Sequence, residues 1–385
     1  MKILHVAPIK GFEEGNISNK ELKLPPEGIS ASVPKLAEGQ FKSGKKVGVI
    51  SSFLSSRSVA KSIYWATLSE YNTFSLLLGS PYKKVINEFG KPDLLNIHDI
   101  YNLKQILFSI PFLSNGIKVY VTPRGTFSEV ALARSRYKKL FFLFFYRLYA
   151  RFIHAFIALN QREKEQISKI FPENKIIIIG NGVDYSETRN TKFEKHFEEK
   201  LIKNSINVGF LGRFDIYIKG LDILLNAYLQ YQKRESNIKI RLSLLGEHRV
   251  REFDSKDFIN RIKSDMPAPE MLKVSGPYYG LSKWEELAKL DLLIQPSRTE
   301  GMPNTVLEAM SSGVPCAVSP NTNVGEMIVR AKAGWIIDCT EKDILDFFLL
   351  VQNYDKKQLI DLGNNAKEYT KANLTWDNIG KINYF

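Results

Sequence analysis

The stretch PSRTEGMPNTVLEAMSSGVP, residues 296–315, carries the most informative pattern in this sequence. It overlaps LDLLIQPS (290–297), an apolar run bounded by Pro and Ser that predicts a buried strand. A turn, a run of good helix formers (VLEAM) and a closing Gly and Pro follow, which predicts a loop and then a helix. The backbone expected at this helix start, pointing beyond the carboxyl end of the strand, is that of Pro303, Asn304, Thr305 and Val306.

Two carboxylates, Glu300 and Glu308, lie eight positions apart on either side of the predicted loop. A helix N-terminus carries unpaired N–H groups and about half a positive charge, which suits a phosphate at the mouth of a parallel sheet. Glu300 precedes that position and Glu308 lies about one turn inside the helix. One carboxylate can then accept hydrogen bonds from the hydroxyls of a sugar and the other from a ribose. A surface loop with a capping Glu is the alternative.

This segment resembles the donor-site signature of the GT-B glycosyltransferases usually called family 4, the glycosyl transferases of group 1. A second motif follows in the order of that family: LGRFDIYIKGLDILLNAY (211–228) is similar to its G-R-x(n)-K-G stretch. The resemblance implies that Arg213 and Lys219 bind the diphosphate of the donor. An Arg fork and a Lys point charge at a helix start would stabilise the negative charge that leaves with the nucleotide. Solvated charges on a loop are the alternative.

Two further segments are assigned to the donor by the same resemblance. The turn from Gly276 to Tyr278 is expected beside the nucleotide base, where Tyr278 either stacks on the base or packs as an ordinary core residue. In the first half, MKILHVAP (1–8) predicts a strand, and a glycine, a helix and a second strand follow in residues 25–51. Family members often carry two adjacent glycines at this turn, whereas here only Gly28 matches. The resemblance implies that Gly28 approaches either the donor phosphate or the acceptor.

The first half also holds a histidine and an arginine at predicted strand ends. PDLLNIHDIYN (92–102) predicts a buried strand that ends in His98, and the resemblance implies that this imidazole or its backbone carbonyl supports the donor sugar. KVYVTPRGTFSEVAL (118–132) resembles a P-R-G segment found mostly in enzymes that build bacterial surface polysaccharides. Arg124 is then expected to face the acceptor. The alternatives are a structural histidine and an arginine bound to backbone carbonyls.

The resemblance implies a retaining hexosyltransferase, in which Glu300 and His98 hold the sugar while Arg213 and Lys219 stabilise the departing diphosphate. Such chemistry passes through an oxocarbenium-like transition state. The acceptor oxygen is expected to attack on the face of the leaving group, so no protein nucleophile is required. No D-x-D motif occurs in the sequence, so we expect no metal site, no cofactor and a metal-independent reaction.

Charge is unevenly distributed along the sequence. Residues 1–185 hold 26 Lys/Arg and 14 Asp/Glu, whereas the remainder holds 28 and 27. The densest basic segment, ARSRYKKLFFLFFYRLYARF (133–152), has an apolar run far too short to cross a bilayer, which needs about 20 residues. A basic helix rich in aromatic residues fits anionic lipid and a polyprenyl-linked saccharide acceptor. The alternative is that its Phe residues face the core. No recognition motif for nucleic acid accompanies it.

The composition indicates the cellular compartment and the number of domains. With 385 residues, of which 44% are hydrophobic, the chain is long enough for two or three domains. Cys316 and Cys339 show neither metal spacing nor a disulfide framework, and the apolar start of the chain is too short for a secretory signal. We therefore expect a cytoplasmic protein, peripheral on the inner face of the plasma membrane.

Both halves alternate predicted strands and helices, which predicts an α/β fold of the GT-B type, with two doubly wound Rossmann-like domains facing across a cleft. The expected limits are 1–185 for an acceptor-side domain, 186–365 for a nucleotide-sugar domain, and 366–385 for a helix that crosses back to the first domain. The expected function is sugar transfer from a nucleoside-diphosphate sugar in capsule, O-antigen or exopolysaccharide synthesis. A nucleotide-sugar epimerase, a glycogen-type or sucrose-type enzyme and a non-enzymatic sugar-binding module are the competing interpretations.

Overall fold

The computed structural model describes residues 1–9, 28–53, 59–133, 136–184, 205–248 and 255–384. The chain divides into two compact units: unit 1 comprises Met1–Gly182 with Trp376–Phe385, and unit 2 comprises Val183–Thr375. The predicted boundary at 185 and 186, and most of the hinge expected near 181–190, lie outside the described residues.

Unit 1 is built around a parallel seven-stranded sheet with the order β3-β2-β1-β4-β5-β6-β7. Its strands are β1 (Lys2–Ala7), β2 (Lys46–Ser51), β3 (Tyr64–Thr67), β4 (Leu94–His98), β5 (Lys118–Thr122), β6 (Ala155–Ala158) and β7 (Ile176–Ile178). Its helices are α1 (Ile29–Lys42), α2 (Thr73–Leu77), α3 (Ser80–Glu88), α4 (Leu103–Ser114), α5 (Glu129–Ala133), α6 (Arg136–Ala150), α7 (Gln161–Ile170) and α16 (Trp376–Lys381). The order of the strands reverses between β1 and β4, where ligands bind in open α/β sheets.

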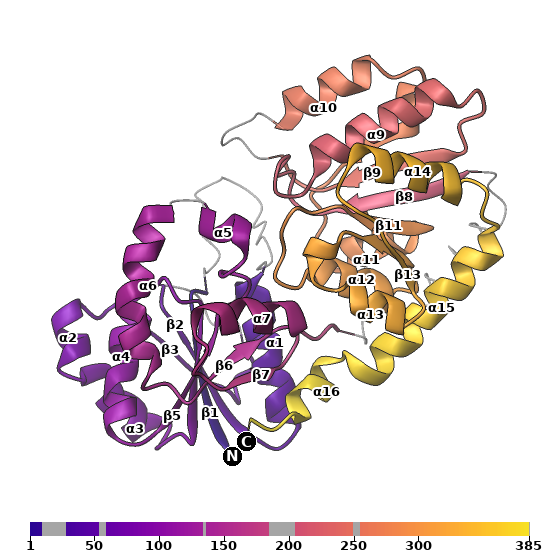
Figure 1. Cartoon of the computed structure of the whole chain (residues 1–385). Coiled ribbons are helices and arrows are strands. Elements are labelled where there is room, and N and C mark those ends of the chain that lie inside the picture. Colours follow the sequence, from indigo (N-terminus) through magenta and orange to yellow (C-terminus); the bar gives the residue numbers. More distant parts are fainter. Residues whose placement is uncertain (10–27, 54–58, 134–135, 185–204, 249–254, 385) are drawn as a thin grey trace, which may run out of the picture. The chain divides into compact units, whose positions relative to one another are not determined.

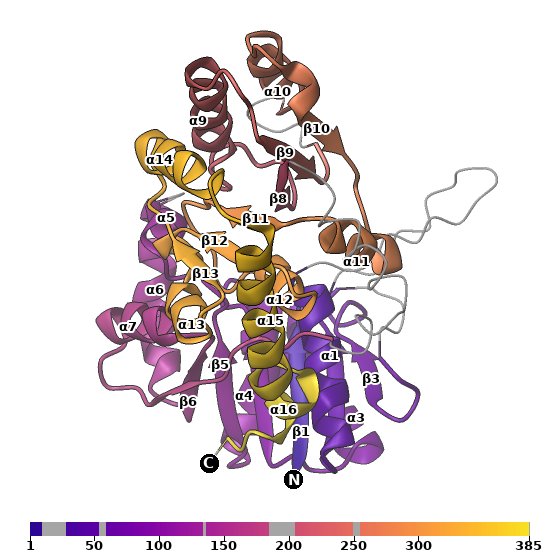
Figure 2. The same cartoon turned by 90° about the vertical axis from the view of Figure 1, so that its right-hand side faces the viewer.

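Both faces of the unit 1 sheet are covered, as the apolar runs of its central strands require. Helices α1 and α16 pack together on one face, and α4 and α6 lie on the other (Figures 1 and 2). Side chains alternate between the faces, so Leu95 and Ile97 of β4 enter the core beneath α4 and α6. Asn96 and His98 therefore point to the face covered by α1 and α16.

Unit 2 repeats this plan with a parallel six-stranded sheet in the order β10-β9-β8-β11-β12-β13. Its strands are β8 (Ile206–Leu211), β9 (Ile240–Leu245), β10 (Leu272–Ser275), β11 (Leu292–Gln295), β12 (Cys316–Val318) and β13 (Gly334–Ile336). Its helices are α9 (Leu221–Arg234), α10 (Ser255–Ser264), η2 (Pro269–Met271), α11 (Gly280–Ala288), α12 (Asn304–Ser311), η3 (Pro320–Thr322), α13 (Gly325–Arg330), α14 (Glu341–Val351) and α15 (Lys356–Asn373). The reversal of strand order here lies between β8 and β11.

Helices again cover both faces of the sheet in unit 2, with α9 and α14 on one face and α11, α12 and α13 on the other (Figure 1). The strand predicted from LDLLIQPS is confirmed as β11, and the loop and helix predicted after it are confirmed as residues 296–303 and α12. The predicted α/β class with two doubly wound units is confirmed as well.

The C-terminal segment differs in detail from the single helix expected over 366–385. Residues 366–373 continue α15, which begins at Lys356 because the side chains of Asp355 and Gln358 cap its first turn. The helix ends at Asn373, and a separate short helix, α16, follows from Trp376. Residues 376–385 belong to unit 1.

Candidate functional site

Three functional residues expected in the second half of the chain lie in two loops of unit 2: Arg213 and Lys219 in the loop after β8, and Glu300 in the loop after β11. Both strands end at the reversal of strand order. The loops contact each other: the amide of Arg298 donates to the carbonyl of Ile218 at 2.9 Å. Gly220, at a φ of +67°, lies so close to the carbonyl of Pro296 that an added Cβ would come within 2.1 Å of it. Glycine at this position therefore permits the close approach of the two loops.

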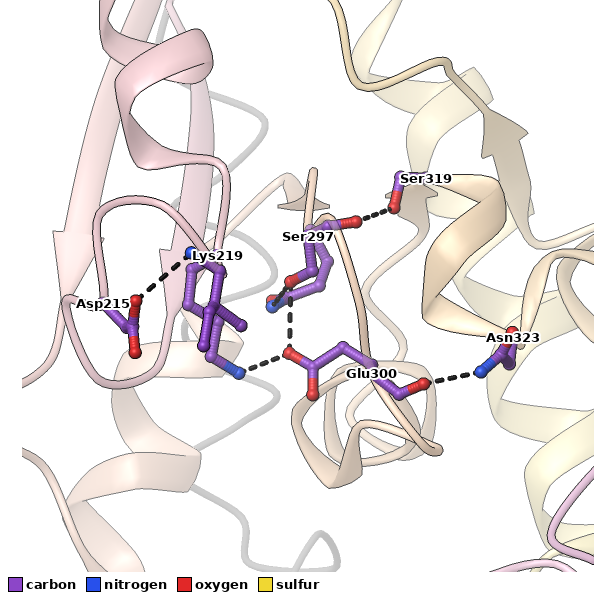
Figure 3. Close-up of polar contacts among 8 residues, drawn as sticks. Asp215, Lys219, Ser297, Glu300, Ser319 and Asn323 are labelled. Atoms are coloured by element: carbon purple, nitrogen blue, oxygen red, sulfur yellow. Dashed lines mark hydrogen bonds and ion pairs between the residues drawn. The ribbon is translucent and has the colours of Figure 1, made fainter. Parts of the chain in front are cut away.

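Lys219 and Glu300, one from each loop, form an ion pair (Figure 3). Their side chains are only 15% and 16% exposed, so the pair is largely shielded from water. The hydroxyl of Ser297 also donates to the Glu300 carboxylate, at 3.1 Å, and receives a hydrogen bond from the Gln295 amide at 2.9 Å. The structure thus brings together the carboxylate predicted to hold a sugar and the lysine predicted to hold a diphosphate.

The backbone of Glu300 is held as firmly as its side chain. Its amide donates to the carbonyl of Asn321 at 3.0 Å, and its carbonyl accepts from the side-chain amide of Asn323 at 2.5 Å (Figure 3). Asn323 has a φ of 62°, in the left-handed region that Asn tolerates better than most residues. The hydroxyl of Ser319 secures the carbonyl of Ser297 at 2.5 Å. The loop that carries Glu300 is therefore preorganised.

Arg213 is exposed at the start of the loop after β8. The loop turns immediately behind it, because Asp215 accepts hydrogen bonds from Lys219 N at 2.9 Å and, through its carboxylate, from Ile218 N at 3.2 Å. Arg213 and Lys219 are thus placed on one short loop at the carboxyl end of β8, the arrangement expected for two cations that share one polyanion.

The start of α12 differs in part from the prediction for residues 303–306. The helix begins at Asn304 with Pro303 as its N-cap. Pro303 has no N–H, however, and the Val306 amide donates to the Pro303 carbonyl at 3.2 Å. Neither residue can donate a backbone hydrogen bond to a ligand in this conformation, which corrects the expectation for the backbone of Pro303, Asn304, Thr305 and Val306 at these two residues.

Glu308 occupies the second turn of α12, where its carboxylate pairs with Lys283 of α11 at 2.6 Å. The side chains are 16% and 24% exposed, and the ammonium lies 5.3 Å from the centre of the Trp284 ring. Each of the two predicted carboxylates is therefore paired with a lysine from a neighbouring element.

Gly276 and Tyr278 lie after β10, at the carboxyl edge of the same sheet. Gly276 has a φ of +112° and packs so closely on Gly246 that an added Cβ would come within 2.8 Å of its nitrogen. Tyr278 is partly buried against the core beneath α11 and α12. This contact agrees with the alternative stated from the sequence, in which Tyr278 packs as a core residue.

Arg298 was not predicted from the sequence, although it lies within the same motif. Its guanidinium binds the Asp222 carboxylate through two hydrogen bonds of 2.7 and 2.8 Å, and its centre lies 4.3 Å from the middle of the Tyr217 ring. The hydrogen bonds that Arg298 donates to the Asp222 carboxylate raise the pKa of Arg298. This fork joins the loop after β11 to the start of α9. No local signal in the sequence indicated this pairing, because Asp222 follows β8 and Arg298 follows β11, which become neighbours only in the folded sheet.

Unit 1 places Gly28 and His98 at its own reversal of strand order, between β1 and β4, and Arg124 after the neighbouring strand β5. Gly28 precedes α1 with a φ of 56°, which only glycine adopts readily. His98 ends β4 and is fully buried, with Nδ1 accepting from Arg124 Nε at 3.2 Å and Nε2 lying 3.0 Å from His5 Nδ1. Burial, together with the charge of Arg124, holds the pKa of His98 well below its usual value, so the ring is neutral. Both ring nitrogens have protein partners.

Arg124 is held by side chains, not by the backbone carbonyls of the alternative interpretation. Besides His98, its Nη1 donates to Ser32 at 3.1 Å and Asn181 at 3.0 Å. Its φ of 58° is unusual for a non-glycine residue, and such strain often marks a functional position. Burial lowers the pKa of Arg124 to about 10, although the nearby Glu163 opposes the shift. Arg124 and His98 line a small cavity with room for about one water molecule.

The role of Glu163 was also not predicted from the sequence. This fully buried carboxylate accepts from the amides of Gly125 at 2.5 Å and Leu159 at 2.7 Å. Burial raises the pKa of Glu163, against the effect of these bonds and of Arg124. It anchors the turn after Arg124, and its isolated position in NQREKEQI gave no signal for this role.

Helix α6 carries the basic and aromatic segment. Leu143 and Tyr146 face the core, but the large side chains on the other face are exposed by half or more: Tyr137, Leu140, Phe141, Phe144, Phe145 and Leu148, followed by Phe152. We call these seven residues the aromatic surface of α6. Exposed basic residues flank them: Lys138, Arg147 and Arg151. The alternative in which the Phe residues face the core is wrong for Phe141, Phe144 and Phe145. Arg134 and the side chain of Arg136 lie outside the described residues.

The described part of the chain, residues 1–9, 28–53, 59–133, 136–184, 205–248 and 255–384, holds neither a membrane-spanning helix nor a cluster of metal ligands. No helix there is long and apolar enough to cross a membrane. Within the same ranges, no group of three or more His, Cys, Asp or Glu side chains is arranged to hold a metal ion. The metal-independent reaction stays a prediction.

Comparison with known families matches both units. Residues 205–348 match the family described as Glycosyl transferases group 1, and residues 26–187 match the one described as Glycosyltransferase Family 4. Among curated proteins, the capsular polysaccharide biosynthesis glycosyltransferase CapM of Staphylococcus aureus is 25% identical over 195 residues, 47% of each chain. The chain thus spans about half the length of the curated relatives that it matches.

Solved structures resemble the chain over nearly its whole length. HepE of Anabaena in complex with UDP-glucose has a TM-score of 0.71 at 16% identity, covering 99% of this chain and 97% of that one. Sucrose-phosphate synthase of Thermosynechococcus elongatus has a TM-score of 0.73 at 14% identity, covering 99% and 96%. At these identities the likeness establishes the fold, and the predicted GT-B class is confirmed.

Proposed function

The chain belongs to the glycosyl transferases of group 1, and from that membership we propose that it moves a hexose-type sugar from a nucleoside diphosphate to a saccharide acceptor. The observation that carries the proposal is the Lys219–Glu300 pair, held at the reversal of strand order in the unit that matches the family. A cation for the leaving diphosphate and a carboxylate for sugar hydroxyls are thereby within reach of one ligand.

The ion pair suggests how donor binding begins. An incoming diphosphate competes with Glu300 for the Lys219 ammonium, because a phosphate offers more negative charge than a carboxylate. Arg213, exposed on the same loop, completes the contact. As Lys219 turns to the phosphate, Glu300 gains a free oxygen for a sugar hydroxyl while Ser297 keeps it in place. Glu308, paired with Lys283, is assigned to the ribose.

We propose retention of configuration through an oxocarbenium-like transition state. The bond between the anomeric carbon and the phosphate oxygen breaks while the acceptor oxygen approaches from the same face. Its proton passes to the departing phosphate. Arg213 and Lys219 stabilise the charge that develops on the diphosphate, which is the largest demand of the step. His98 and Arg124 of unit 1 are assigned to the sugar and the acceptor by the family resemblance.

The experiment on the donor removes both cations. We expect Arg213→Ala with Lys219→Ala to lower kcat/KM by roughly 100-fold or more and to abolish nucleotide binding. Lys233→Ala with Arg234→Ala removes the same charges from the exposed end of α9 and is the matched control. Unchanged turnover and nucleotide affinity in the first variant would refute the proposed function. Thermal unfolding with UDP-, GDP- and dTDP-sugars would identify the base.

We also propose that the reaction needs no metal, since the two cations and the helix start supply the positive charge. Activity should then survive EDTA, in buffers free of divalent ions. Loss of activity with EDTA and its return with Mn²⁺ would contradict this part of the proposal alone.

The acceptor is proposed to be polyprenyl-linked, with the protein peripheral on the inner face of the plasma membrane. The support is the aromatic surface of α6 with its basic flank, because aromatic rings enter the headgroup region while Lys and Arg meet anionic lipid at about 1 kcal/mol per charge. Phe141→Ser with Phe144→Ser should weaken sedimentation with anionic vesicles. Leu350→Ser, an exposed leucine of unit 2, is the control. Equal binding by both variants would argue against this surface.

The pathway is proposed to be bacterial surface polysaccharide synthesis, which the match to a capsule enzyme supports. Measuring nucleotide release with and without a lipid-linked acceptor separates the alternatives. A transferase releases nucleoside diphosphate only when acceptor is present. An epimerase converts the sugar without needing an acceptor, and a binding module releases nothing.

A further inference from the structure

A continuous chain of hydrogen bonds runs through the buried interior of unit 1. Arg124 Nε donates to His98 Nδ1 at 3.2 Å, and His98 Nε2 lies 3.0 Å from His5 Nδ1. His5 Nε2 lies 2.7 Å from Gln40 Oε1, and Gln40 Nε2 donates to the Tyr384 hydroxyl at 2.7 Å. Apart from Arg124, every member is at most 2% exposed. These hydrogen bonds, which we call the relay, link the P-R-G turn to the C-terminal segment.

The direction of this chain follows from Arg124 alone. A guanidinium can donate hydrogen bonds but cannot accept them. His98 Nδ1 must therefore be the acceptor, and its proton resides on Nε2, which donates to His5 Nδ1. By the same logic His5 carries its proton on Nε2 and donates to Gln40 Oε1.

The orientation of the Gln40 amide agrees with this direction, because its nitrogen then faces the Tyr384 hydroxyl. A doubly protonated His98 would place its Nδ1–H against the N–H of Arg124. A doubly protonated His5 would place its Nδ1–H against the Nε2–H of His98. The alternative direction, with a flipped Gln40 amide, would place an N–H of His98 against the N–H of Arg124. One arrangement of protons satisfies every contact.

We propose that Arg124 sets the direction of this relay, and that Gln40 and Tyr384 are positioning residues that hold the His98 ring in a single Nε2–H tautomer. The catalytic consequence rests on the function proposed above, in which His98 supports the sugar. The tail residue Tyr384 thereby acts on His98 through three hydrogen bonds, although it is not itself placed against any ligand. None of these roles was predicted from the sequence.

The proton positions are tested directly by nitrogen NMR of the full chain labelled at its 5 histidines, with assignment by single His→Gln variants. In the wild type we expect Nε2 of His5 and His98 to be protonated and Nδ1 to be bare, with no second tautomer. Arg124→Met removes the donor, so a population of His98 with a protonated Nδ1 should appear. Arg124→Lys, which also can only donate, should restore the single tautomer.

A protonated Nδ1 on either ring in the wild type overturns the proposal, as does an unchanged tautomer in Arg124→Met. Should Arg124→Met fail to fold, the wild-type spectrum and that of Arg124→Lys still decide the direction of the relay. These spectra need no substrate. They therefore report on the relay even if the chain proves to lack transferase activity, and the two failures are distinguishable.

The positioning role is tested by kinetics with a matched pair of variants. Tyr384→Phe removes the hydroxyl that ends the relay, whereas Tyr120→Phe removes the hydroxyl that donates to the Tyr384 carbonyl at 3.0 Å. Each variant loses one buried hydroxyl that forms a hydrogen bond with Tyr384 or belongs to it. We expect Tyr384→Phe to lower kcat several-fold with an unchanged donor KM, and Tyr120→Phe to keep the wild-type kcat. An equal fall of kcat in both variants would mean that the C-terminal segment matters only because it is anchored to unit 1, and that the relay has no separate role.

Discussion

Acidification should weaken unit 1 through its buried histidines, and the effect can be worked out for His5. Burial lowers the pKa of His5 from 6.5 to about 4, and the charge of Arg124 acts in the same direction, while the bond to Gln40 opposes them. The folded pKa lies below the unfolded one, so the unfolded chain takes up a proton first as the pH falls. The stability that this group contributes is complete above pH 6.5 and is lost progressively down to about pH 4.

The magnitude follows from the size of the shift. At about 1.4 kcal/mol per pH unit, the change of the His5 pKa from 6.5 to about 4 corresponds to about 3 kcal/mol of unfolding free energy. The shift of His98 has the same sign and adds to it. A loss of this size is a large share of the stability of an ordinary domain.

The assay is urea unfolding between pH 7.5 and 4.5, with pulsed hydrogen exchange to read the peptides of β1 and β4. In His5→Gln the amide can still bond to Gln40 but does not titrate, so the difference in stability between wild type and variant should change by about 1.4 kcal/mol per pH unit below 6.5. Carboxylates titrate in both proteins and cancel. His248→Gln, at an exposed histidine of unit 2, is the control. Parallel stability curves for wild type and His5→Gln would refute the reasoning.

Three further outcomes are expected. Gly39→Ala should destabilise unit 1 by about 1–3 kcal/mol in urea unfolding, because its Cβ would lie 2.2 Å from the Trp376 carbonyl and push α16 from α1. Asn323→Gly should keep the backbone conformation but release Glu300, so the donor KM should rise while the melting temperature stays near wild type; a KM equal to wild type would mean that the bond of 2.5 Å is dispensable. Arg298→Lys should cost about 1 kcal/mol in unfolding free energy, since the fork to Asp222 is lost, and Asp222→Asn should cost a similar amount.

The sequence predicted strands and turns well because they depend on neighbouring residues. The apolar run before Ser297 and the helix formers after Pro303 determine β11 and α12 locally, and both were placed correctly. The pairing of Lys219 with Glu300 could not be predicted, since it depends on which strands lie side by side in the folded sheet.

His5 shows the same limit in unit 1. In MKILHVAP it is one polar residue in an apolar strand, and its partners Gln40 and His98 come from distant segments. Its place between Ile3 and Ala7, on one face of β1, was a usable signal, because a polar side chain pointing into a core needs a partner. Nothing local indicated which partner it would have.

The division of the chain gives unit 1 an unusual order of assembly. Its core includes Trp376, Ile379 and Tyr384, which the ribosome adds only after every residue of unit 2. The half that emerges first is therefore the half that is completed last, whereas unit 2 can fold as one uninterrupted stretch during synthesis. A gene fragment ending at Gly182 would encode a sheet with an uncovered apolar strip, and attaching residues 376–385 to that fragment through a short linker should restore a protein that can be purified.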